Sequence, residues 1–147
     1  MYKKILFIFA LLVTFISSAE TSAILSSEEL KSKIVEINKA QNKAIMLGTT
    51  VDDVDKLFSL YTDDFIYIHE VYGGIYKRDE LYKNTVKYVK NGGYTRTDDR
   101  YQIISMIPGH NAIAVERKQT YEEKTTNHLA VFEFTGDKVS KITEYWQ

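Results

Sequence analysis

The hydrophobic pattern of this chain changes its period once, and that change limits the folds available to it. Up to residue 90 the apolar residues recur mainly at helical spacing, whereas from Tyr94 onward they alternate with polar residues, as in strands with one buried face. The later part predicts four strands, which cover residues 97–107, 112–122, 127–134 and 139–146. Helices gathered early and an antiparallel meander late predict an α+β domain, with helices packed on one face of a curved sheet.

The earlier part of the chain predicts three helices and a short pair of strands. Ser26 with Glu29, and Thr50 with Asp53, fit the capping-box pattern, in which a side chain satisfies backbone N–H groups at a helix start. The predicted elements are helices from Ser26 to about Gly48, from Thr50 to about Tyr61 and from about Asp79 to Lys90, and strands at residues 65–71 and 75–76.

Residues 1–19 have the layout of a secretory signal peptide. Lys3 and Lys4 precede an apolar run over residues 5–16 that contains one polar residue, Thr14, and this run is too short for a membrane anchor. Cleavage is expected after Ala19, with Ala23 as the alternative. The sequence therefore predicts a secreted or periplasmic protein without stable membrane insertion after cleavage, in which residues 20–147 form a single domain.

Composition argues against several classes of protein. Removal of the two leader lysines changes the net charge from −1 to −3, because 17 basic residues then face 20 acidic ones, and no basic patch for nucleic acid is present. The chain has no cysteine, and the spacing of His69, His110 and His128 matches no metal-binding pattern. It also has no recognisable nucleophile motif and no phosphate-binding glycine loop. We therefore expect no metal, no cofactor and no nucleic-acid partner.

Three short stretches carry a resemblance to a known family. They are YTDDFIYIHE at residues 61–70, G-x-Y-K-R-D-E-L at residues 74–81 and KVSKITEYW at residues 138–146. With the order of the predicted elements, they resemble the nuclear transport factor two-like superfamily, SnoaL-like branch, over nearly all of the mature chain. The resemblance implies a cone-shaped, antiparallel-rich curved sheet wrapped around three helices, with a pocket at its wide end. That superfamily includes isomerases, dehydratases, cyclases, epoxide hydrolases and proteins without catalysis, so the fold assigns no reaction.

His69 and Tyr67 are the candidate catalytic residues. Alternation along their strand puts them on one face together with Phe65. The resemblance implies that the position of His69 supplies a general acid or base in isomerase-like and cyclase-like relatives. An imidazole with an ordinary pKa near 6.5 suits that role at neutral pH. The alternative is a structural histidine on a half-buried strand.

Six further residues are candidates for binding the ligand. They are Gln41, Phe65, Tyr72, Tyr88, His128 and Phe132. The resemblance places Gln41 where steroid-isomerase relatives carry a catalytic tyrosine, and His128 or Ala130 where they carry a second acid, so an oxyanion hole of that type is not expected. Tyrosines around the third helix would form the rim of the pocket, or else cover a small core as boundary residues.

Two functions follow from these residues. The first is an exported small-molecule-binding domain that acts on a small hydrophobic substrate by proton transfer, in an isomerisation, dehydration or cyclisation. The alternative is a non-catalytic module of the same fold that binds a ligand or associates with a protein, and the sequence does not decide whether the chain is an enzyme. The resemblance also implies a homodimer formed through the outer face of the sheet, with Leu129, Val131, Tyr145 and Trp146 as candidate contacts.

Overall fold

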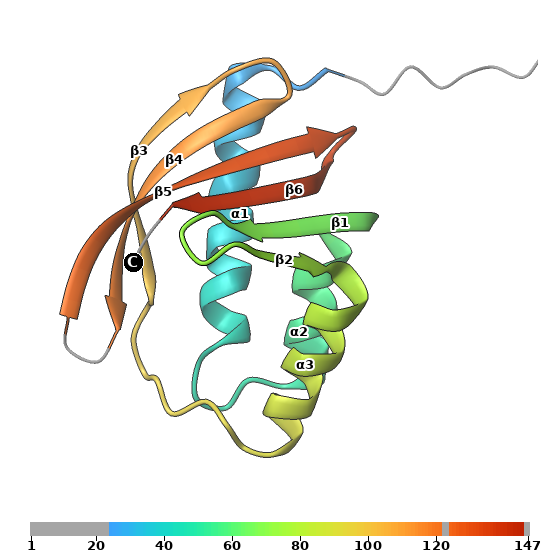
Figure 1. The fold of residues 1–147 in the computed structure, drawn as a ribbon, viewed down its shortest axis with the longest axis vertical. Coiled ribbons are helices and arrows are strands. Elements are labelled where there is room, and N and C mark those ends of the chain that lie inside the picture. Colours follow the sequence, from blue (N-terminus) through green and yellow to red (C-terminus); the bar gives the residue numbers. More distant parts are fainter. Residues whose placement is uncertain (1–23, 122–123, 146–147) are drawn as a thin grey trace, which may run out of the picture.

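The computed structural model describes residues 24–121 and 124–145, which form three helices and six strands (Figure 1). In chain order the elements are α1 (Ser27–Ala44), α2 (Val51–Ser59), β1 (Tyr61–His69), β2 (Gly74–Lys77), α3 (Arg78–Lys90), β3 (Tyr101–Pro108), β4 (Ala112–Tyr121), β5 (Lys124–Thr135) and β6 (Lys138–Tyr145). The predicted signal peptide and Trp146 lie outside the described residues. None of the described helices is both long enough and apolar enough to cross a membrane.

A single mixed sheet holds the six strands in the order β2-β1-β6-β5-β4-β3. The strands β3 to β6 form the predicted antiparallel meander, and β1 pairs antiparallel with β2. β1 runs parallel to β6, so the first and last strands of the chain lie side by side. The sheet is curved and open, with the helices on one side of it (Figure 1). The predicted α+β architecture is confirmed.

Both N-terminal helices begin where their capping boxes predict. Ser26 Oγ accepts the backbone N–H of Glu29, and Thr50 Oγ1 accepts that of Asp53, each at 3.3 Å. Each acidic side chain in turn accepts the backbone N–H of its capping residue. These reciprocal bonds satisfy N–H groups that the helix itself leaves without acceptors, and so fix the first turn.

The core lies between the helices and the inner face of the sheet. Its buried apolar side chains include Leu30, Ile34 and Ile37 of α1, Val54, Leu57 and Phe58 of α2, and Phe65, Ile113, Val115, Phe132, Phe134, Val139 and Ile142 of the sheet. Burial of a side chain of this size stabilises the fold by roughly 1.5–3 kcal/mol. The core thus holds the inner face of the sheet and the helices in a fixed relation without any disulfide.

The strand predicted from residue 97 begins at Tyr101 instead. The chain before it is bonded instead to the turn between α1 and α2, since Arg96 O accepts the N–H of Leu47 at 2.6 Å. At Tyr101 the amide of Asn42 acts like a neighbouring strand: its Nδ2 donates to Tyr101 O and its Oδ1 accepts from Tyr101 N, both at 2.9 Å. A side chain of α1 therefore sets the start of β3.

Two other strands also start earlier than predicted. β1 begins at Tyr61 rather than residue 65, because Tyr61 already pairs with Val139 of β6 across a bulge. β5 begins at Lys124 rather than residue 127, and it continues the pairing with β4 up to the hairpin turn. In both cases cross-strand pairing extends into polar residues that the hydrophobic pattern does not reveal.

Candidate ligand-binding site

A cavity of about 180 Å³ lies between the three helices and the inner face of the sheet. The apolar part of its wall is formed by Ala44, Ile45, Leu57, Phe58, Phe65, Leu81 and Ile142. The polar part is formed by Gln41, Tyr61, Tyr67, Thr85, Tyr101 and Glu144. An apolar wall with a few polar groups at one place is the usual composition of a small-molecule site.

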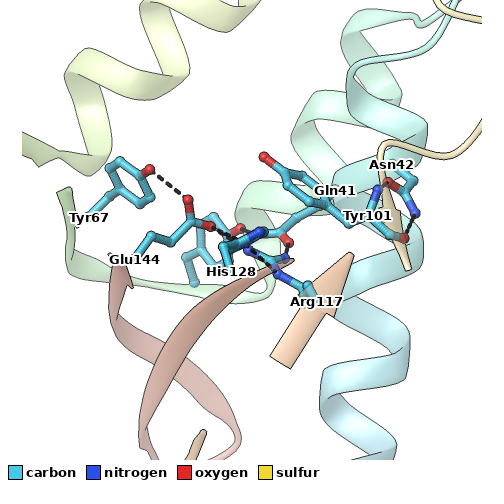
Figure 2. A network of polar contacts seen from close by, with 8 residues as sticks. Gln41, Asn42, Tyr67, Tyr101, Arg117, His128 and Glu144 are labelled. Carbon is cyan, nitrogen blue, oxygen red and sulfur yellow. Dashed lines mark hydrogen bonds and ion pairs between the residues drawn. The ribbon is translucent and has the colours of Figure 1, made fainter. Parts of the chain in front are cut away.

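Arg117 of β4 holds the polar side of this site together (Figure 2). Its guanidinium donates to three acceptors: Gln41 Oε1 at 2.7 Å from Nη1, His128 Nε2 at 3.3 Å from Nε, and Glu144 Oε1 from Nη2. The side chains of Arg117 and Glu144 are only 1% and 4% exposed. A charge buried this deeply requires a charged partner and hydrogen bonds, and here both conditions are met.

Strand alternation explains why these side chains meet. Arg117 follows Ile113 and Val115 on the inner face of β4, and His128 lies directly opposite Arg117 on β5. Glu144 lies on β6, the next strand beyond β5. Because inward-facing side chains of adjacent strands are neighbours, the guanidinium reaches across β5 to the carboxylate.

Two aromatic rings flank the guanidinium of Arg117. Its Cζ lies 4.2 Å from the ring centroid of Tyr101 and 5.4 Å from that of Phe132, which are distances typical of cation–π contacts. Asn42 holds the backbone of Tyr101 as described above, so α1 also positions the residue that carries this ring (Figure 2). The rings reduce the access of water, and electrostatic interactions are stronger in such a place.

His128 is held as a neutral hydrogen-bond acceptor. Its Nε2 accepts from Arg117 Nε, which places the proton of the neutral ring on Nδ1. Burial, and then the positive charge of Arg117, lower the pKa of His128 from 6.5 to about 4. At neutral pH this imidazole therefore orients the guanidinium and carries no charge.

Tyrosine hydroxyls complete the polar side of the cavity. Tyr67 donates to Glu144 Oε2 at 2.8 Å, and Tyr61 accepts from Gln41 Nε2 at 3.1 Å. Burial raises the pKa of the Tyr61 hydroxyl, and burial followed by the charge of Glu144 raises that of Tyr101. These phenols therefore stay protonated over the whole physiological pH range and can donate hydrogen bonds.

Among the residues that the sequence suggested, Gln41, Phe65 and Tyr67 line the cavity. The predicted face of β1 is also correct, since Phe65 and His69 are 2% and 5% exposed, whereas Ile66 is 37% exposed. Phe132 lies in the core beneath Arg117. His128 belongs to the network behind the cavity wall.

The other suggested residues lie elsewhere. His69 is not among the residues that line the cavity, because the strand carries it past Tyr67 to the β1–β2 turn. There its ring stacks on Tyr72 with 4.5 Å between centroids, and its Nδ1 accepts the N–H of Tyr72 at 3.3 Å. Tyr88 lines a separate groove beside the cavity. The catalytic role of His69 stays a prediction.

Sequence reasoning missed the two central residues of the site, Arg117 and Glu144. A signal was present: Arg117 continues the alternating row of Ile113 and Val115, and Glu144 follows Ile142 at the same spacing of two. A charged residue on the apolar face of a strand needs a buried partner. Two such positions on strands of one sheet would have predicted their ion pair.

The described residues contain no group of three or more histidine or acidic side chains placed to hold a metal ion. The site is therefore a network of one ion pair, one neutral histidine, an amide and phenols.

Comparison with known proteins identifies the architecture. No protein-family model and no curated protein matches this sequence. Solved structures do match: an NTF2-like protein of unknown function from Pseudomonas aeruginosa is 15% identical with a TM-score of 0.66, over 81% of this chain and 98% of that one. A candidate ketosteroid isomerase from Kribbella flavida is 13% identical with a TM-score of 0.62, over 82% and 78%. An NTF2-like protein of unknown function from Burkholderia xenovorans is 17% identical with a TM-score of 0.59, over 80% and 82%.

Structural similarity at such low sequence identity establishes a shared fold, but it does not identify the reaction. All of these matches extend over most of both chains. The helices and strands of this chain follow one another in the order that the sequence predicts. The chain therefore has the fold of the nuclear transport factor two-like (NTF2-like) superfamily.

Proposed function

We propose that this chain is an exported small-molecule-binding domain of the SnoaL-like type, which holds a small, largely apolar molecule in the cavity in front of Arg117 and Glu144. The observation that carries the proposal is the division of the cavity wall into an apolar part and a polar part. The polar part is fixed in advance, because each of its main side chains is bonded to another: Gln41 to Tyr61, Tyr67 to Glu144, and Glu144 to Arg117. A prearranged site loses less conformational entropy when it binds.

The volume of the cavity limits the size of the ligand. An apolar protein cavity of roughly 150 Å³ is large enough to bind benzene, and this cavity measures about 180 Å³. It therefore suits a molecule, or the end of a molecule, about the size of one substituted ring.

The polar groups suit a ligand that carries a carbonyl group. Tyr61 accepts a hydrogen bond from Gln41, so its own proton can be turned toward a ligand oxygen. Glu144, in the same wall, presents a carboxylate that can accept a proton from a carbon next to that carbonyl. This pairing of a donor and a base supports proton transfer, as in an isomerisation, dehydration or cyclisation, as the second candidate function.

Binding is tested first with acetophenone, a neutral one-ring ketone, by NMR titration of the protein without residues 1–19. We expect shifts at the methyl groups of Ile45, Leu57 and Leu81, which line the cavity. Ala44→Leu fills the cavity and should abolish these shifts. Ala40→Leu, one turn earlier on α1 and outside the cavity wall, should preserve them. Equal binding by the two variants would contradict the proposed site.

Proton transfer is tested on the same ketone in D₂O. A domain that removes the proton next to the carbonyl will exchange the methyl protons of acetophenone for deuterium, faster than buffer alone. Tyr61→Phe, which removes the proposed hydrogen-bond donor, should slow this exchange. If bound acetophenone exchanges no faster than in buffer, the domain binds without catalysis.

We also propose the homodimer through the outer face of the sheet. Paired positions form an outward-facing row across all six strands: Ile75, Ile68, Thr143, Val131, Ala114 and Ile107. Ile75 and Ile107, at its two ends, are 68% and 71% exposed. Between them Ile68, Val131 and Ala114 are half-buried, and Thr143 is buried. Exposed apolar side chains on one face often mark an interface, and a second copy would cover them with an identical row.

A further inference from the structure

A groove of about 750 Å³ adjoins the cavity and opens between the end of α3 and residues 93–100. Figure 1 shows this stretch of chain running from α3 to the start of β3. Ile45 and Thr85 line both the groove and the cavity. The two spaces are therefore neighbours with a shared wall, and a ligand longer than one ring can extend from the first into the second.

One wall of the groove is aromatic. The rings of Tyr88 and Tyr94 meet edge to face, with 4.6 Å between their centroids. Gly93 allows this arrangement, because a Cβ at that position would lie 2.4 Å from the Tyr88 ring. Rings fixed in this way offer flat contact to the middle of a ligand.

The groove also carries an excess of positive charge. Its lining contains Arg96, Arg100 and one acid, Asp98. Arg96 is fixed by Asp98 at 3.1 Å and by the carbonyl of Thr120 at 2.5 Å. The lining thus contains more guanidinium groups than carboxylates, a composition that favours an anion.

Arg100 lies at the junction between the groove and the cavity. Its guanidinium carbon is 5.3 Å from the ring centroid of Tyr101, which lines the cavity. Burial raises the pKa of the Tyr94 hydroxyl in the groove, and the positive charge of Arg100 partly offsets this rise. An anionic group placed here would lie next to the opening of the apolar space.

We propose that the ligand is an elongated monocarboxylic acid, whose apolar end fills the cavity and whose carboxylate lies in the groove beside Arg100 and Arg96. This inference rests on the proposed binding function and specifies its ligand class. The cavity receives the ring-sized apolar end, the tyrosine wall contacts the middle, and the arginines bind the acid. Guanidinium groups match carboxylates in geometry and charge.

The test compares 4-phenylbutanoate with 4-phenylbutanamide, which has the same shape without the charge. Dissociation constants are measured by NMR titration or calorimetry on the protein without residues 1–19. We expect the acid to bind about tenfold more tightly than the amide at low salt, with a smaller difference at high salt because counterions screen the charge. Arg100→Gln should remove this difference, and Arg100→Lys should retain most of it.

Lys87→Gln is the matched control, since it removes one positive charge from the exposed side of α3 without touching the groove lining. It should leave the preference for the acid unchanged. Unfolding curves of the Arg100 variants verify that each is folded before binding is compared.

The outcomes separate this inference from the proposed function. If acetophenone binds and the acid and amide bind equally, the acidic ligand class is wrong and the cavity site stands. If the acid is preferred but Arg100→Gln preserves the preference, the carboxylate lies elsewhere and the inference is overturned. If neither acetophenone nor the acid perturbs the cavity residues, the proposed function itself fails.

Discussion

Glu144→Gln should destabilise the folded chain far more than loss of an exposed carboxylate. The change keeps the size of the side chain, and its amide oxygen can still accept from Arg117 or Tyr67, so mainly the charge is lost. Arg117 would then be a cation with 1% exposure and no carboxylate partner. Two unit charges about 4 Å apart interact by about 4 kcal/mol at an effective dielectric of about 20. Removal of one partner from a buried pair typically costs about 3–5 kcal/mol.

Urea unfolding followed by circular dichroism measures this loss. With a slope of about 1–3 kcal/mol per M of urea, a loss of about 3 kcal/mol lowers the midpoint by roughly 1–3 M. The matched control is Glu133→Gln, which removes the acid of the pair with Lys141, whose side chains are 42% and 35% exposed. That pair should contribute no more than about 1 kcal/mol.

The double variant Arg117→Met/Glu144→Gln tests the same reasoning from the other side. It should be less destabilised than the sum of the two single variants, because no uncompensated charge remains buried. Equal effects of Glu144→Gln and Glu133→Gln, or strict additivity in the double variant, would refute the view that Glu144 neutralises Arg117 in a dry site.

Three further predictions address other parts of the structure. Because burial and Arg117 lower the pKa of His128 from 6.5 to about 4, the unfolded chain binds more protons between these values. The free energy of unfolding should therefore fall as the pH decreases from about 7 toward 4, with a contribution from His128 on the order of 2–3 kcal/mol, and urea titrations at several pH values should show a shallower pH dependence for His128→Gln. Tyr67→Phe removes the hydrogen bond to the Glu144 carboxylate and should lower the free energy of unfolding by about 1.5–3 kcal/mol, and an unchanged midpoint would contradict that bond. Leu129→Lys places a charge on the outer face of the sheet and should give a folded monomer in light scattering, whereas a persistent dimer would place the interface elsewhere.

The sequence predicted the fold well because the evidence for it is local. Capping residues such as Ser26 and Thr50 act within one helical turn, and strand alternation is read from neighbours two residues apart. The bounds of β3 depend instead on Asn42, a side chain 59 residues away that binds the backbone of Tyr101. Such contacts appear only when the helix and the sheet are placed together.

Local sequence signals likewise predicted only part of the cavity wall. Alternation put Phe65, Tyr67 and His69 on the correct face of β1, but it could not say how far along the strand the cavity extends. The chain reaches the hairpin turn at His69, where the imidazole meets Tyr72. The partner of Tyr67 is Glu144, 77 residues later, and the parallel pairing of β1 with β6 brings the two strands together.

The ion pair of Arg117 and Glu144 is difficult to explain by stability alone. A buried pair replaced by apolar side chains of similar volume often leaves a protein as stable as before, or more stable. Here the pair interrupts two apolar rows on the inner face of the sheet, and Glu144 faces a cavity. Proteins tend to break local folding rules of this kind at functional positions. The exclusion of water makes the pair costly, and it also strengthens the electrostatic interaction of the carboxylate with any molecule in the cavity. An exposed acid on the surface lacks this effect, so the buried pair is the better candidate for a functional group.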